Sequence, residues 1–268
     1  MKDCKGKTVL ITGGAAGIGK IMARMFLELG AKVIIWDINQ DKILEAIREF
    51  SSLGVISGYQ VDVSDISMVK EVAAKVKHDA GVVDVLINNA GIIVGKYFHE
   101  HATTDILKTM EVNANAPMIV TAEFLADMMK QNSGHICNIA SSGGIVSNPK
   151  MSVYAGSKWA VIGWSDSLRL EMLQLKKNVK VTTIMPYYIN TGMFDGVKSR
   201  IPILKPEYAA RRIVKAIRKN KKMITIPGYL YRLTRISQGI FSIGVFDWFA
   251  DNVFAIYKTM EHFSGHKK

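Results

Sequence analysis

The sequence predicts an α/β protein in which helices cover both faces of a doubly wound parallel sheet of about seven strands. Three observations support this prediction. Short apolar runs rich in β-branched residues alternate with longer helical stretches along the chain. The 268 residues, of which 49% are hydrophobic, suffice for one large core. No linker, repeat or low-complexity tract divides residues 1–268, so we expect a single domain.

We expect the seven strands near residues 7–12, 32–37, 56–62, 83–88, 134–140, 179–185 and 222–226. Because helical stretches separate successive strands, the connections should be right-handed crossovers between parallel strands. The segment at about 228–263 departs from this alternation, being rich in Phe, Tyr, Ile and Trp.

A glycine-rich turn follows the first expected strand, where Gly13-Gly14-Ala15-Ala16-Gly17-Ile18-Gly19 leads into an amphipathic run that stops at Gly30. Such a turn lets the backbone approach phosphate groups, and the dipole of the following helix favours their charge. The sequence therefore predicts a dinucleotide site here. The residues expected to touch the cofactor are Gly13, Gly17, Ile18 and Gly19.

The second expected strand ends at Asp37, which lies 18 residues after Gly19. A carboxylate at this point can accept hydrogen bonds from both ribose hydroxyls of an adenosine and would repel a 2′-phosphate. No Arg or Lys lies within the glycine turn or directly after Asp37 to neutralise such a phosphate. The cofactor expected is therefore NAD (NADH) rather than NADPH. The alternative is that Asp37 is a turn or cap residue together with Asn39.

Tyr154 and Lys158 lie four residues apart, which places them on one face of a helix. A neighbouring ammonium favours phenolate, so the pKa of Tyr154 should fall below its usual value of roughly 10. A tyrosine with such a pKa can pass a proton to or from an alcohol near neutral pH. By itself, however, the pair occurs by chance on many surface helices.

Together with other motifs, these residues make the chain resemble the short-chain dehydrogenases/reductases along nearly its whole length. Thr12–Gly19 is similar to the glycine motif of that family, and Asn88-Asn89-Ala90-Gly91 to its Asn-Asn-Ala-Gly motif. Asp62-Val63 resembles its adenine-contacting pair. Asn113 lies 24 residues after Asn89, and Ser141 lies 13 before Tyr154, at the spacing of the family's catalytic Asn and Ser.

The resemblance implies a Rossmann-like fold and a catalytic set of Asn113, Ser141, Tyr154 and Lys158. Tyr154 is then the general acid/base, Ser141 donates to the substrate oxygen, and Lys158 tunes Tyr154 and bonds the nicotinamide ribose. Asn113 would position a water that connects Lys158 to solvent. The further cofactor contacts implied are Asp62, Val63, Asn89, Ala90, Gly91, Tyr154, Lys158, Pro186, Ile189 and Thr191.

Some of these assignments have alternatives. Ser142 is an immediate rival of Ser141, which could instead cap the end of its strand. Asn113 could instead be a polar packing residue at a helix kink.

Two stretches, residues 35–39 and 186–194, resemble the branch of the family that contains epidermal retinol dehydrogenases and lipid-droplet 17β-hydroxysteroid dehydrogenases. Two departures accompany this likeness. Tyr187 stands where most of the family has Gly, but the named branch also lacks Gly at this position. The chain begins Met1-Lys2-Asp3, without the hydrophobic anchor that is typical of the branch.

The resemblance implies an NAD(H)-dependent oxidoreductase that interconverts a hydrophobic alcohol, such as a retinoid, steroid or long-chain alcohol, and its carbonyl. It also implies a homodimer or homotetramer assembled through helices near 103–131 and 152–174. An NADPH carbonyl reductase is disfavoured by Asp37. A non-catalytic NAD-binding protein of a lipid surface is disfavoured by the intact catalytic set.

The net charge of +12 is concentrated at the C-terminal end, where residues 176–268 carry 18 Lys and Arg against 5 Asp and Glu. Nucleic acid is disfavoured as a partner, because no nucleic-acid-binding module is visible and apolar residues follow the basic ones. The remaining interpretations are a solvated helix face near Arg211 and Lys215, or contact with anionic lipid head groups. The segment at about 228–263 is then a substrate lid, a dimer face or a surface that touches a membrane.

The setting expected is cytoplasmic and reducing, with peripheral contact at a membrane or lipid surface left open. No apolar signal region follows Lys2, and acidic residues interrupt the apolar stretches near the C-terminus. Cys4 and Cys137 provide no disulfide framework. No metal site is expected, since His99, His101 and His135 lack the spacing of metal ligands.

Overall fold

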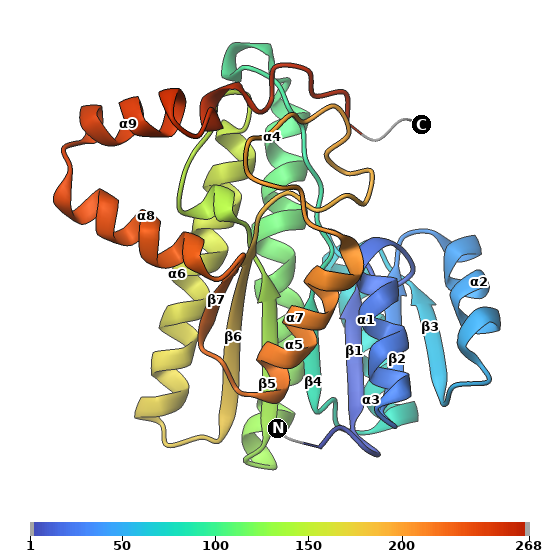
Figure 1. The fold of residues 1–268 in the computed structure, drawn as a ribbon. Helices are drawn as coiled ribbons and strands as arrows, with labels where there is room; N and C mark the ends of the chain where they lie inside the picture. The colour runs from blue at the N-terminus through green and yellow to red at the C-terminus, as the bar shows by residue number, and fades with distance from the viewer. Residues whose placement is uncertain (1–2, 266–268) are drawn as a thin grey trace.

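The computed structural model describes residues 3–265, which form a seven-stranded parallel sheet in the order β3-β2-β1-β4-β5-β6-β7 (Figure 1). The strands are β1 (Thr8–Thr12), β2 (Lys32–Asp37), β3 (Ile56–Gln60), β4 (Val85–Asn88), β5 (Gly134–Ile139), β6 (Val179–Pro186) and β7 (Met223–Ile226). The predicted fold class is confirmed, and the predicted strand ends agree within two residues. The strand order reverses between β1 and β4, which opens a crevice at their carboxyl ends.

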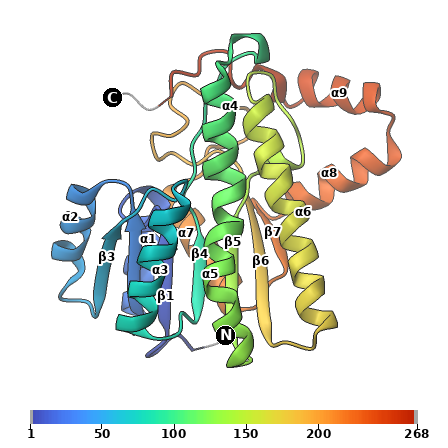
Figure 2. The same ribbon diagram turned by 180° about the vertical axis from the view of Figure 1, so that it is seen from behind.

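Helices cover both faces of the sheet. The helices are α1 (Gly17–Glu28), α2 (Gln40–Phe50), α3 (Ile66–Ala80), α4 (Thr103–Met110), α5 (Ala116–Lys130), α6 (Ser152–Gln174), α7 (Pro206–Arg218), α8 (Tyr229–Ile240) and α9 (Ile243–Asn252). Figure 1 shows α1, α2 and α7 on one face, and Figure 2 shows α3, α4, α5 and α6 on the other. Sequence alternation of strands and helices therefore produces three layers.

The core consists of one apolar layer on each side of the sheet. In β1, Ile11 points into the layer under α1 and α7, whereas the adjacent Leu10 points into the layer under α3 and α5. Trp36 of β2 packs against Phe124 of α5, with ring centroids 5.9 Å apart. Both faces of each central strand are thus buried, which is why these strands read as continuous apolar runs.

A buried polar network crosses the second of these layers. Asn88 donates its amide hydrogens to Asn138 Oδ1 at 2.8 Å and to Thr121 Oγ1 at 3.0 Å, and Asn138 donates to Ser165 Oγ at 2.8 Å. These bonds join β4 and β5 to α5 and α6 just below the carboxyl ends of the strands. They hold the helix that carries Tyr154 in register with the sheet.

The segment after β7 forms a projecting pair of helices. Figures 1 and 2 show α8 and α9 extending away from the sheet, with α9 returning towards the carboxyl edge. We call residues 229–252 the α8–α9 hairpin. Within residues 3–265, no helix has the length and apolar character needed to cross a bilayer.

We predict that Asn138→Ala lowers the free energy of unfolding by about 1–3 kcal/mol. The substitution removes the two buried hydrogen bonds that join Asn138 to Asn88 and to Ser165. Urea unfolding without added ligand measures this effect. Ser165→Ala removes a single bond of the network and should cost less. An Asn138→Ala midpoint equal to that of the wild type would show that the network adds nothing to stability.

Candidate active site

The glycine turn between β1 and α1 depends on backbone conformations that favour glycine. Gly13 and Gly17 have φ values of +61° and +51°. A Cβ on Gly19 would lie 2.0 Å from the carbonyl oxygen of Gly13, so the helix can begin this close to the turn only with glycine there. Gly19 therefore packs against the backbone of the turn on the side away from the cavity, whereas Gly13, Gly17 and Ile18 line the cavity.

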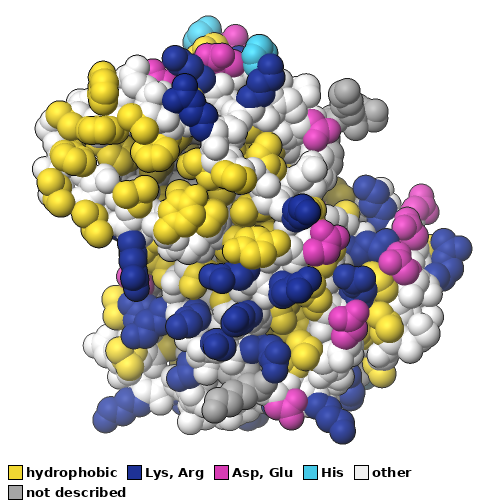
Figure 3. Space-filling view, viewed as in Figure 1, with side chains coloured by type: hydrophobic (Ala, Val, Ile, Leu, Met, Phe, Trp, Pro, Cys, Tyr) yellow, Lys and Arg dark blue, Asp and Glu magenta, His cyan; other side chains and the backbone are white. Residues whose placement is uncertain are grey.

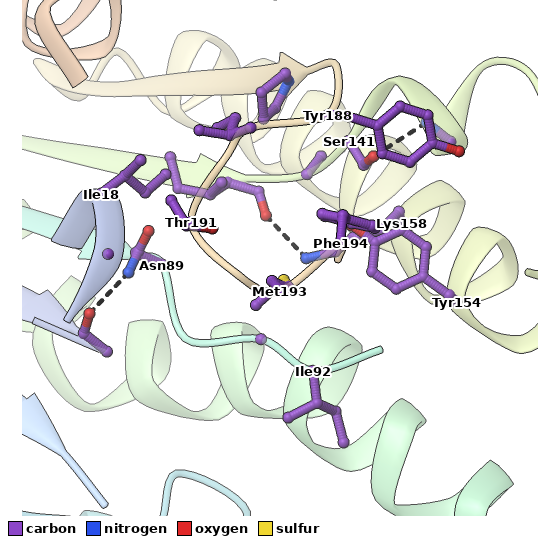
Figure 4. Close-up of a pocket in the computed structure, with 18 of the residues that line it drawn as sticks. Ile18, Asn89, Ile92, Ser141, Tyr154, Lys158, Tyr188, Thr191, Met193 and Phe194 are labelled. Atoms are coloured by element: carbon purple, nitrogen blue, oxygen red, sulfur yellow. Dashed lines mark hydrogen bonds between the residues drawn. The ribbon is translucent and has the colours of Figure 1, made fainter. Parts of the chain in front are cut away.

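Thr12 and Asn89 tie the ends of β1 and β4 together. Thr12 Oγ1 accepts from the backbone N–H groups of Asn89 at 3.0 Å and Ala90 at 3.1 Å. In return, Asn89 Nδ2 donates to the carbonyl oxygens of Thr12 and Gly13, both at 3.0 Å (Figure 4). This reciprocal set fixes the glycine turn against the loop that follows β4.

A cavity of about 690 Å³ runs along the carboxyl ends of the strands. Most of the predicted site residues line it: Gly13, Gly17, Ile18, Asp37, Asp62, Val63, Asn89, Ala90, Gly91, Ser141, Tyr154, Lys158, Pro186, Ile189 and Thr191. Of the predicted residues, Gly19 and Asn113 are absent from its lining. No group of three or more potential metal-ligating His, Cys, Asp or Glu side chains occurs within residues 3–265.

Asp37 closes one end of this cavity. Its Oδ2 accepts from the backbone N–H of Ala15 at 3.1 Å, and its Oδ1 accepts from that of Asn39 at 3.2 Å. It is thus a turn residue, as the alternative interpretation held, and it also lines the cavity. Lys42, in the first turn of α2, lines the same end, although its position five residues after Asp37 gives no sequence signal.

Asp62 also borders this end of the cavity, where it is held ionised. Burial by itself would raise the pKa of Asp62, but hydrogen bonds from Ser64 and Lys108 outweigh burial and lower it. Lys108 Nζ lies 3.0 Å from Asp62 Oδ2 and 2.6 Å from Ser64 Oγ. The ion pair fastens the loop after β3 to α4 and leaves the backbone of Asp62 and Val63 along the cavity wall.

Ser141, Tyr154 and Lys158 converge at the other end (Figure 4). Ser141 lies two residues after β5, and its Oγ accepts from the backbone N–H of Gly143 at 3.1 Å, so it caps the 3₁₀ turn Ser142–Gly144 rather than the end of the strand. A Cβ placed on Gly143 would lie 3.5 Å from Ser141 Oγ and 3.6 Å from Tyr154 Cε1, so the hydroxyl and the ring border the same space. Ser142 lines the cavity as well.

Lys158 does not lower the pKa of Tyr154 in this structure, contrary to the sequence-based prediction. Lys158 Nζ donates to the carbonyl oxygen of Ile139 at 3.0 Å and lies 5.7 Å from the centroid of the Tyr154 ring. Burial raises the pKa of Tyr154 to about 12, although its interaction with Ser141 opposes the rise. Burial likewise lowers the pKa of Lys158 to about 8. Desolvation is the largest cause of both shifts because both side chains are almost wholly shielded from water.

Asn113 lies outside the cavity lining, in a π-helical turn, Glu111–Asn115, between α4 and α5. Its amide exchanges hydrogen bonds with the backbone of Ile92, Oδ1 accepting at 2.8 Å and Nδ2 donating at 2.9 Å. Nδ2 also donates to Ser157 Oγ at 3.2 Å, and Ser157 donates to the carbonyl oxygen of Tyr154 at 2.6 Å. Asn113 therefore occupies a helix irregularity and braces α6, the helix that carries Tyr154 and Lys158, through Ser157.

Aromatic and aliphatic side chains enclose the cavity beyond Tyr154. The Phe194 ring lies between Tyr154 and Tyr188, with centroid distances of 6.1 and 5.0 Å. The other apolar residues of this part are Ile145, Val146, Met151, Ile201, Leu230 and Ile256. Tyr187, which replaces the common Gly, is buried and its hydroxyl lies 2.7 Å from Ser199 Oγ.

One polar group interrupts this apolar part. Asn148 Nδ2 donates to Tyr188 Oη at 3.0 Å and to Thr259 Oγ1 at 3.1 Å. Its Oδ1 is buried without a hydrogen-bond partner among the described residues. Neither Asn148 nor Tyr188 carries a sequence signal that distinguishes it from a packing residue.

A glycine turn on a Rossmann-type sheet, joined by one cavity to a Ser, Tyr and Lys set, defines a nucleotide-dependent oxidoreductase. The family model described as short chain dehydrogenase matches residues 7–201, and the chain belongs to this family of oxidoreductases acting on CH–OH donors.

Among curated proteins, epidermal retinol dehydrogenase 2 of Mus musculus is 35% identical over 275 residues, covering 100% of this chain and 88% of the relative. Estradiol 17-beta-dehydrogenase 11 of Homo sapiens is 35% identical over 240 residues, covering 88% and 80%. A solved short-chain dehydrogenase/reductase from Burkholderia phymatum in complex with NAD superposes with a TM-score of 0.81 at 22% identity, covering 89% and 95%. The sequence-based family resemblance is confirmed.

We predict that Lys158→Met changes the pH dependence of stability. Because the folded pKa of about 8 lies below the usual 10.5, the folded state releases its proton first, so wild-type stability should rise with pH above about 8. Relative to Lys158→Met, the wild type should gain on the order of 2 kcal/mol between pH 7 and 9.5. Denaturant unfolding at a series of pH values measures the difference, and parallel curves for the two proteins would contradict a buried, depressed ammonium.

Proposed function

We propose that this protein is an NAD(H)-dependent oxidoreductase that interconverts a hydrophobic alcohol and its carbonyl. The observation that carries the proposal is the single cavity, which has a carboxylate and a glycine turn at one end, Ser141 and Tyr154 at the other, and apolar walls beyond them. A dinucleotide and an apolar substrate would then meet beside Tyr154.

The residues of the cavity fit NAD. The positive φ of Gly13 and Gly17 leaves backbone open to a pyrophosphate at the N-terminus of α1, and Asp37 offers carboxylate oxygens to a ribose. The backbone of Asp62-Val63 and of Asn89-Ala90-Gly91 would border the adenine and ribose groups. When bound, this cofactor accepts or supplies the hydride.

The chain's own residues supply proton transfer and orientation. With its pKa raised to about 12, the Tyr154 phenol keeps its proton and can donate it to a carbonyl oxygen during reduction. Ser141 Oγ–H would donate to the same oxygen and hold it near the phenol. In the oxidative direction Tyr154 must accept the alcohol proton, which the Lys158 ammonium in its charged form favours.

The substrate class proposed is a retinoid-, steroid- or long-chain-alcohol-like molecule. Relatives named as a retinol dehydrogenase and an estradiol 17-beta-dehydrogenase support it, as do the aromatic and aliphatic walls formed by Tyr188, Phe194 and their neighbours. The free acceptor of Asn148 would suit a substrate that carries a second hydroxyl.

A homodimer or homotetramer is part of the proposal. The interface is expected at α4, α5 and α6, and of these α4 exposes Leu107 while α6 exposes Trp159 and Leu170. Contact there would brace the helix that carries Tyr154. A fully active species that sediments as a monomer at micromolar concentration would contradict this assembly.

An NADPH carbonyl reductase is a second candidate, because Lys42 lines the cavity beside Asp37 and could meet a 2′-phosphate. We expect repulsion of the 2′-phosphate by Asp37 to outweigh its attraction to Lys42, since the Asp37 carboxylate is also fixed by the backbone N–H of Ala15. We predict that the wild type binds NADH much more tightly than NADPH. Asp37→Asn should reduce the ratio of the two affinities at least about tenfold, because it removes the repulsion between the carboxylate and the 2′-phosphate.

Fluorescence titration with both cofactors measures the ratio, with Asp37→Asn/Lys42→Ala as the matched control. If Lys42 is the remaining attraction for the 2′-phosphate, the double variant should lose the gain in NADPH affinity. Equal affinities in the wild type would show that Asp37 does not face the ribose.

We predict that Tyr154→Phe lowers kcat by roughly 100- to 10,000-fold, because it removes the proton donor while keeping the ring that packs on Phe194. A panel of lipophilic alcohols with NAD, read by NADH absorbance, tests both the activity and the substrate class. Cofactor affinity and the unfolding midpoint of the variant serve as controls. Near-normal turnover in Tyr154→Phe would defeat the proposed mechanism.

A further inference from the structure

The α8–α9 hairpin presents a broad apolar surface outside the core. Its most exposed large apolar side chains are Ile243 at 81%, Ile240 at 71%, Ile236 at 59% and Trp248 at 58%. Leu233, Phe241, Val245 and Phe249 are also exposed, as are Val253 and Phe254 directly after the hairpin. Figure 3 shows these hydrophobic side chains gathered over the hairpin, at the upper left of the view. A patch of this extent on a projecting element indicates a binding surface.

The apolar surface is preformed. Phe249 stacks on Phe241 with ring centroids 5.7 Å apart and meets Trp248 edge-on at 5.1 Å. Two hydrogen bonds fasten α8 to the body: near its start the Tyr231 N–H donates to Thr225 Oγ1 at 3.0 Å, and near its end Gln238 Nε2 donates to the carbonyl oxygen of Ile145 at 3.0 Å. The hairpin can therefore hold its aromatic side chains out for a partner.

The same helix borders the candidate active site. Leu230 and Thr234, on the inner side of α8, line the cavity, and so does Ile256 after α9. Leu233 and Ile236, on neighbouring positions of α8, are exposed. A single helix thus separates the apolar surface from the apolar part of the cavity.

Positive charge accompanies this surface. Arg232 and Arg235 are exposed on α8, and Arg211, Lys215 and Lys219 are exposed on α7 and just after it. Figure 3 shows Lys and Arg side chains gathered below the apolar patch on the same face of the molecule. The two acidic residues of the hairpin, Asp247 and Asp251, are only half-exposed, and Asp247 accepts from the Tyr257 hydroxyl.

We propose that the α8–α9 hairpin docks this protein on an anionic lipid leaflet, with its apolar side chains among the acyl chains and the basic residues at the head groups. A lipophilic alcohol then passes from the leaflet into the cavity alongside Leu230 and Thr234. A second copy of this chain fits less well, because each chain carries a net charge of +12 and would bring the same basic residues to the contact. The delivery step rests on the proposed oxidoreductase function, whereas the docking does not.

Co-sedimentation with vesicles tests the docking. The wild type should pellet with vesicles that contain 30% phosphatidylserine at low salt, less at high salt, and little with pure phosphatidylcholine. Ile243→Glu/Trp248→Glu should lower the vesicle affinity at least about tenfold, since both side chains lose their apolar contact with the leaflet. Arg232→Gln/Arg235→Gln should weaken binding and reduce its salt dependence.

Val55→Glu/Leu175→Glu is the matched control, because it adds the same charge at side chains that are 65% and 56% exposed outside the hairpin. It should bind vesicles nearly as well as the wild type. The proposal would be overturned if the wild type did not bind anionic vesicles at low salt. It would also be overturned if Val55→Glu/Leu175→Glu lost as much vesicle affinity as Ile243→Glu/Trp248→Glu. An Ile243→Glu/Trp248→Glu protein that binds vesicles normally but dissociates from dimer to monomer would overturn it too, because the face would then join two copies.

Activity on a water-soluble short-chain alcohol, measured without vesicles, separates the two proposals. Vesicle binding without activity on any alcohol would contradict the proposed function and leave the docking intact. Activity without vesicle binding would contradict the docking alone. If both hold, anionic vesicles should lower the KM of the wild type for a lipophilic alcohol and should not lower that of Ile243→Glu/Trp248→Glu.

Discussion

The hydrogen bonds between Thr12 and Asn89 are the constraint on which the candidate site depends. They close the gap between β1 and β4, where the strand order reverses and the crossovers leave the sheet in opposite directions. From there the path of bonds continues through the loop after β4 to Asn113, and through Ser157 to the backbone of Tyr154. The glycine turn and Tyr154 are thereby connected by one path of hydrogen bonds, which would hold a cofactor and a proton donor in fixed relative positions.

Burial is the largest influence on the pKa values of Tyr154 and Lys158. Desolvation raises the pKa of Tyr154 to about 12 and lowers that of Lys158 to about 8, so the phenol holds its proton more firmly, and the ammonium less firmly, than in water. The Ile139 carbonyl oxygen satisfies one proton of the lysine and keeps it beside the tyrosine ring. Added positive charge or water near Tyr154 would therefore change its acidity more than the same change at a solvated site.

The α8–α9 hairpin connects the shape of the cavity to the surface of the molecule. A helix that faces an apolar cavity on one side and water on the other normally carries apolar residues on the first side and polar residues on the second. Here both sides are apolar, which is costly in water and favourable beside lipid. The basic residues of α7 and α8 lie on the same face, so they would determine how the apolar surface is oriented against an anionic leaflet.

The sequence by itself determined the sheet, the strand positions and the glycine turn, because each depends on local periodicity or glycine conformation. It also singled out Ser141, Tyr154 and Lys158 by motif spacing, and all three line the cavity. Only the tertiary structure decided features that depend on what other elements bring alongside. Lys42 reaches the end of the cavity near Asp37, Asn113 braces Tyr154 through Ser157, and Asn148 keeps a free acceptor. The direction of the Tyr154 pKa shift belongs to the same group, since a spacing of four residues reports proximity of charge but not the depth of burial that outweighs it.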